Sequence, residues 1–83
     1  MDKDELKAAV VALLEEVLKA RFDGAAYARL SRAHGYADGY MRALQDAGLV
    51  DKNELLTLVG ETRRSFVERE TTAPVAVPVA ASA

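Results

Sequence analysis

Apolar residues recur at three- and four-residue steps along most of the chain, which is the period of an α-helix and not of a strand. The pattern predicts three helices, over residues 4–21, 25–47 and 52–70. We therefore predict an all-α fold, a small three-helix bundle that occupies residues 1–70.

The first predicted helix is apolar on two sides. Its main face comprises Leu6, Ala9, Val10, Leu13, Val17 and Ala20. A second row, made of Val11, Leu14 and Leu18, lies roughly 100–160° further round the helix. Both apolar sides of such a helix have to be buried, by the other helices or by another chain. The second row is therefore a candidate partner-binding surface.

The other two helices each have one predicted core face. In the second helix these positions are Ala26, Leu30, Ala33, Ala37, Met41 and Leu44. In the third they are Leu55, Leu58, Val59 and Phe66, with Leu56 and Val67 at the flank.

Polar residues and glycines mark the helix ends. Two pairs have the spacing of a capping box, Asp2 with Glu5 and Asp51 with Glu54. Asp23 is predicted to cap the start of the second helix. Gly48 is predicted to close that helix in a left-handed conformation, with Leu49 as the apolar contact of the cap.

Residues 71–83 contain no charged residue and two prolines, Pro74 and Pro78. Proline disfavours helix, and the small side chains of this segment bury little area, so we predict a disordered tail. The alternative is a tail that docks in extended form on a partner through Val75, Val77 and Val79.

Composition excludes several classes of function. The chain has 83 residues, a formal net charge of −2, no cysteine and one histidine. These properties exclude thiolate metal sites and disfavour non-specific phosphate binding, and we predict no metal and no cofactor. No apolar run approaches the roughly 20 residues of a membrane span. The acidic start of the chain lacks the features of a secretory signal, so a cytoplasmic location is expected.

No catalytic constellation is evident. Ser31 and His34 can share a helix face, but no orienting group or oxyanion donor accompanies them in the sequence. The adjacent carboxylates Glu15 and Glu16 diverge on a helix and cannot converge on one substrate. We predict that the protein is not an enzyme.

Residues 30–44 loosely resemble a helix-turn-helix, with Ser31, Gly35, Met41 and Leu44 at the positions of its small, turn and apolar residues. The resemblance implies a DNA-binding regulator, which is the alternative function. Two features disfavour it. His34 stands where that pattern usually has an apolar residue, and the apolar phase continues unbroken across Gly35, as in one continuous helix.

A glycine and tyrosine surface on the second helix is a further candidate for partner binding. Gly35 and Gly39 would let another backbone approach closely, and Tyr36 and Tyr40 project off the core face. Arg29 and Arg32 lie near these rings. The competing interpretation is that both tyrosines cover the edge of the bundle, with the ring buried and the hydroxyl in water.

The arginines Arg63 and Arg64 suit a solvated face near the end of the third helix. The remaining class of function is a non-catalytic interaction module: an adaptor, accessory or structural subunit. We predict that it self-associates or docks on a larger assembly, with a protein partner or a homo-oligomer as the means by which so small a domain gains stability.

Overall fold

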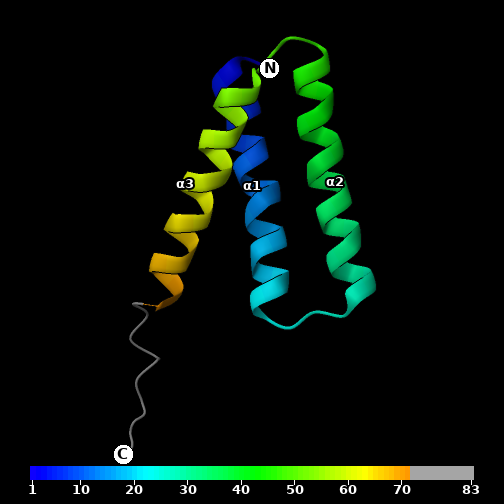
Figure 1. Cartoon of the computed structure of the whole chain (residues 1–83), viewed down its shortest axis with the longest axis vertical. Helices are drawn as coiled ribbons and strands as arrows, with labels where there is room; N and C mark the ends of the chain where they lie inside the picture. The colour runs from blue at the N-terminus through cyan, green and yellow to red at the C-terminus, as the bar shows by residue number, and fades with distance from the viewer. Residues whose placement is uncertain (72–83) are drawn as a thin grey trace, which may run out of the picture.

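The computed structural model describes residues 1–71, and these form three α-helices (Figure 1). They are α1 (Lys3–Phe22), α2 (Tyr27–Asp46) and α3 (Lys52–Thr71), each of 20 residues. The predicted all-α, three-helix fold is confirmed. Within this part of the chain, no helix has the length and apolar character needed to cross a membrane. The tail docking residues Val75, Val77 and Val79 lie outside the described residues.

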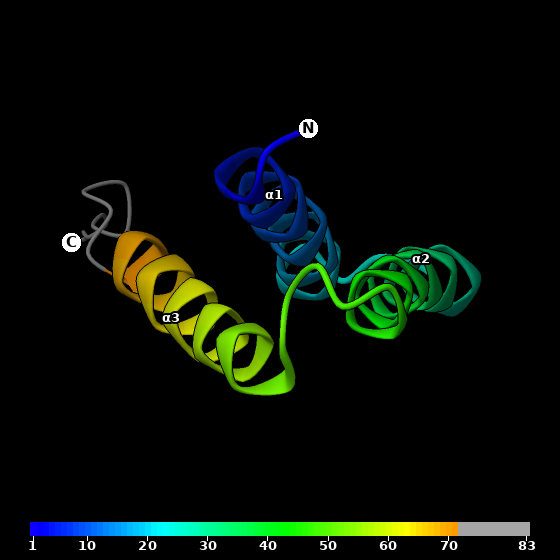
Figure 2. The same cartoon turned by 90° about the horizontal axis from the view of Figure 1, so that it is seen from above.

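The helix α1 lies between the other two and packs against both (Figures 1 and 2). By contrast, α2 and α3 make almost no contact with each other. This arrangement explains why α1 is apolar on two sides, since each side faces a different helix.

The α3 side of α1 is marked by three contacts. They are an ion pair of Lys7 with Glu54 at 3.3 Å, one of Glu15 with Arg69 at 3.0 Å, and the edge-to-face rings of Phe22 and Phe66, 6.0 Å apart. Val11 and Leu18 lie on the same line of the helix and are half-buried. The second apolar row therefore lies on the side of α1 that α3 of the same chain covers.

The tightest part of the core lies near the α2–α3 connection. It consists of Val10, Leu44, Val50 and Leu55, one residue from each helix and one from the loop. The ring of Tyr40 packs against this cluster and is half-buried. The cluster therefore joins all three helices at one end of the bundle.

The α1–α2 connection differs from the prediction. Gly24 has a φ of +71°, and the amides of Gly24 and Ala25 donate to the carbonyls of Arg21 and Ala20, at 3.1 and 2.9 Å. These bonds place Asp23 at the end of α1, as its C-cap. The predicted role of Asp23 as the N-cap of the second helix is therefore wrong. That helix begins two residues later than predicted, after Ala26, which supplies no side-chain cap.

The α2–α3 connection uses the predicted glycine but a different apolar contact. Gly48 has a φ of +74°, and the amide of Leu49 donates to the carbonyl of Leu44 at 3.0 Å. This is the geometry of a glycine-terminated helix. The side chain of Leu49 is 51% exposed, whereas Val50 is 1% exposed. The apolar residue that the loop buries is therefore Val50, whereas Leu49, the predicted apolar contact of the cap, stays half exposed.

The helix α2 runs without interruption from Tyr27 to Asp46 and includes Gly35 in its interior. The helix-turn-helix alternative needed a turn between two helices within residues 30–44. The structure has no turn in that range, so this geometry is wrong for the chain.

Both predicted capping boxes are present. At the start of α1, the amide of Glu5 donates to Asp2 at 2.8 Å, and the amide of Asp2 donates to Glu5 at 2.9 Å. Asp51 and Glu54 repeat this exchange at the start of α3, at 2.8 and 3.0 Å. Each pair supplies acceptors to amides that the first turn of a helix leaves without partners.

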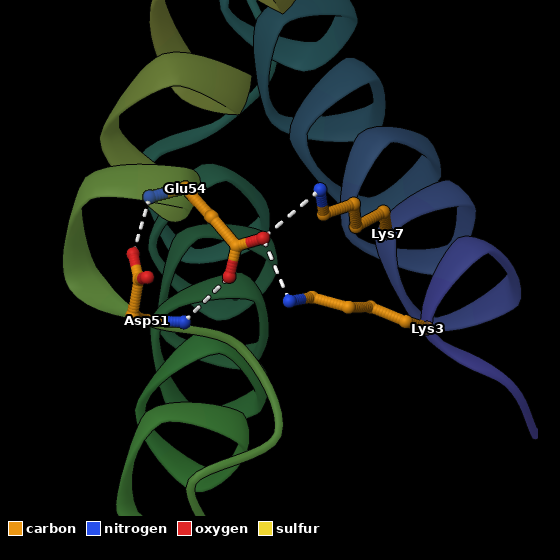
Figure 3. A network of polar contacts seen from close by, with 4 residues as sticks. All are labelled: Lys3, Lys7, Asp51 and Glu54. Carbon is orange, nitrogen blue, oxygen red and sulfur yellow. Dashed lines mark hydrogen bonds and ion pairs between the residues drawn. The ribbon is translucent and has the colours of Figure 1, made fainter.

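The second box also ties α3 to α1, as Figure 3 shows. One oxygen of the Glu54 carboxylate lies 2.8 Å from the Lys3 ammonium and 3.3 Å from that of Lys7. The hydrogen bond from the Asp51 amide, followed by that from Lys3, lowers the pKa of Glu54 to about 2. The same bond to Glu54 raises the pKa of Lys3.

This network predicts an acid-sensitive contribution to stability. Because the pKa of Glu54 is lowered in the folded chain, its contribution is complete above the ordinary pKa of 4.5 and is lost as the pH falls toward about 2. We expect Glu54→Gln to lower the melting temperature at neutral pH and to flatten its dependence on pH in that window. Thermal melts across the window test this. Glu61→Gln, at another α3 carboxylate, is the control, and an equal effect of the two substitutions would contradict the assignment.

Candidate functional site

A groove lies over α1 between the two outer helices. Two adjoining hollows form it, and they share Asp38, Met41 and Val59. We call the whole surface the α2–α3 groove. Its lining is Leu14, Val17, Leu18, Arg21, His34, Ala37, Asp38, Met41, Arg42, Gln45, Lys52, Leu55, Leu56, Val59 and Arg63.

The floor of the groove is apolar, and its rim is charged. Leu14 and Leu18 from α1 are half-buried, as are Met41 and Val59 from the outer helices. Leu56 is 59% exposed although it lines the groove. An apolar strip bounded by polar residues is typical of surfaces that bind proteins.

The predicted partner-binding residues are divided among several surfaces. Leu14 and Leu18 lie in the groove, while Val11 does not line it. Leu14 and Leu18 are still half-buried by other residues of the same chain. The second row of α1 is therefore largely an intramolecular contact, and only part of it is open to a partner.

Arg29, Arg32 and Tyr36 lie together, as the sequence predicted. With Leu13, Glu16 and Ala33 they line a shallow hollow on the α1–α2 side. The side chain of Tyr36 is 65% exposed. This hollow involves two helices and three of its six lining residues are charged, whereas the α2–α3 groove involves all three helices and has an apolar floor. The groove is therefore the better candidate for docking.

Gly35, Gly39 and Tyr40 do not join that hollow. A Cβ atom built on either glycine would meet nothing within 4 Å, so neither is needed for close packing inside the chain. Tyr40 is half-buried against the core cluster, which is the competing interpretation given above for this residue.

His34 contacts Asp38, with 3.1 Å between the ring Nδ1 and the carboxylate. The two residues are one helical turn apart, and their side chains are 54% and 60% exposed. Ser31 is also exposed, and within residues 1–71 no hydrogen bond joins it to His34. The geometry is that of a surface pair on a helix. No group of three or more potential metal ligands occurs in the described part of the chain.

Several groove residues were not predicted as site residues. Arg63 was assigned to a solvated face, and Leu56 and Val59 to the core or its flank. Their sequence spacing, with Leu56 and Arg63 seven residues apart, places them on one side of α3. What the spacing could not show is that α2 lies too far away to cover that side.

Comparisons of the chain with known protein families, with characterised proteins and with solved structures find no match.

Proposed function

We propose that this protein is a non-catalytic interaction module that docks a protein through the α2–α3 groove. The observation that carries the proposal is the separation of α2 from α3, which leaves an apolar strip over α1 accessible from outside. In a three-helix bundle closed on itself, these side chains would be covered.

The shape of the groove favours a helix as its occupant. Helices bind to other proteins by laying an apolar ridge into an apolar groove, with anchors three or four residues apart. Along α3 the groove extends from Lys52 to Arg63, which is about 16 Å at 1.5 Å per residue. That length accommodates about three turns of a docked helix. Such a helix would convert the open bundle into a four-helix arrangement.

Two substitutions on α3 test the proposal. Leu56 lines the groove, and Val67, which is 49% exposed, does not. We expect Leu56→Glu to abolish co-precipitation of a protein partner by the full-length chain from its native host. Val67→Glu places the same charge on the same helix and should leave co-precipitation intact. Both positions are on the surface, so each substitution should change the free energy of unfolding by about 0.5 kcal/mol or less. Equal binding by the two variants would contradict docking in the groove.

A further inference from the structure

We infer that the occupant of the α2–α3 groove is an amphipathic helix with acidic flanks, supplied by a different protein. This inference rests on the proposed function and adds the chemistry of the partner. Its basis is the charge around the groove.

The rim of the groove is cationic, although the chain as a whole has a net charge of −2. Its cationic side chains are Arg21, Arg42, Lys52 and Arg63. Asp38 is the only carboxylate among the lining residues. The charge of the groove is therefore opposite in sign to that of the molecule.

Most of these cations lack an anionic partner within the chain. Among residues 1–71, neither Arg21, Lys52 nor Arg63 forms an ion pair. Arg42 lies 3.6 Å from Asp46, in a pair that is mostly exposed. The one carboxylate of the groove, Asp38, already contacts His34. Acidic side chains on a docked helix would supply the missing counter-charges on both sides of the apolar strip.

A second copy of this chain fits the groove less well. Two exposed apolar residues on its outer helices lie beside further cations: Leu56 near Lys52 and Arg63, and Tyr36 near Arg29 and Arg32. Placing either surface in the groove would bring like charges together, which opposes association.

Two synthetic peptides test the inference on the full-length protein. Each is an amphipathic helix of about 18 residues, or five turns, with leucine at the same positions. One peptide has glutamate on both flanks of the leucine ridge, and the other has lysine there. Fluorescence anisotropy of the labelled peptides gives both affinities at about 50 mM salt, where surface charges are weakly screened.

We expect the glutamate peptide to bind at least roughly tenfold more tightly than the lysine peptide. Arg63→Glu should lower the affinity for the glutamate peptide by a similar factor and raise the affinity for the lysine peptide. Arg64→Glu is the matched control, because Arg64 is the next residue of α3 and lines neither hollow of the groove. It should change each affinity by a factor of about two or less.

Four results would overturn the inference. If both peptides bind equally and Leu56→Glu abolishes both, the groove docks helices without a preference for acidic flanks, and the proposed function stands. If Arg64→Glu lowers the affinity for the glutamate peptide as much as Arg63→Glu does, the electrostatic attraction between protein and peptide does not come from the groove. Failure of both peptides to bind at about 1 mM would exclude this class of ligand. Finally, a micromolar dimer in sedimentation equilibrium that Leu56→Glu dissociates would place a second copy in the groove.

Discussion

Leu44→Ala is expected to lower the free energy of unfolding by about 2–5 kcal/mol, the range for removing a buried leucine side chain. Leu44 is 6% exposed and is the α2 member of the cluster that joins the three helices. A domain of this size has a total stability of about 4–10 kcal/mol. The substitution should therefore remove a large share of the free energy of unfolding, and urea denaturation followed by circular dichroism should show a midpoint at a clearly lower urea concentration.

Leu49→Ala is the control for Leu44, because it makes the same chemical change in the neighbouring loop. The side chain of Leu49 is half exposed, so we expect a loss of less than about 1 kcal/mol. A decrease in the free energy of unfolding as large as that caused by Leu44→Ala would mean that the loop buries Leu49 and not Val50, contrary to the structure.

The second large effect is expected at Phe66, where Phe66→Ala should cost about 3–5 kcal/mol. Phe66 is 8% exposed, its ring packs edge-to-face on Phe22, and the guanidinium of Arg69 lies 5.8 Å from the ring centroid. Since α2 barely contacts α3, the second half of α3 is held to α1 alone. Amide hydrogen exchange should therefore accelerate more in residues 62–71 than in α2.

Val67→Ala provides the comparison for Phe66. Val67 follows Phe66 directly but lies on the outer side of α3, with 49% of the residue exposed. We expect it to change stability by about 0.5 kcal/mol or less. If Phe66→Ala accelerated amide hydrogen exchange in α2 as much as in α3, the unfolding of the two outer helices would be coupled more strongly than their separation implies.

The helices and most of their ends could be predicted from the sequence, because they depend on local interactions. The period of apolar residues gave each helix to within a few residues. The capping boxes of Asp2 and Asp51 depend on a partner three residues away, and both are present. Gly48 likewise needs only its own backbone conformation to end α2.

The errors arose where two helix ends compete for the same residues. Asp23 is a favourable N-cap by composition, but Gly24 ends α1 so that Asp23 belongs to that helix. In the other loop, Leu49 and Val50 are both apolar, and the direction of the chain after Gly48 decides which of them is buried. Thr62, which is 5% exposed, is a buried position of α3 that the pattern of apolar residues does not indicate, because its side chain is polar.

The groove was beyond the reach of sequence patterns for a different reason. The two apolar sides of α1 predicted two neighbours, or a neighbour and another chain. The angle between those neighbours is set by the loops and by the packing of side chains such as Phe66 and Tyr40. A pattern of apolar residues on each helix contains no information on that angle, so Leu56 and Arg63 could not be recognised as groove residues.

The most direct test of docking in the α2–α3 groove is the amide NMR spectrum of the full-length chain during titration with the glutamate peptide. We predict that the resonances that move most belong to the groove, with Leu18, Ala37 and Val59 among them. Resonances of Arg29, Arg32 and Tyr36, on the other side of α2, should stay in place. The opposite pattern, with changes around Tyr36 and none in the groove, would contradict the proposal that a partner docks between α2 and α3.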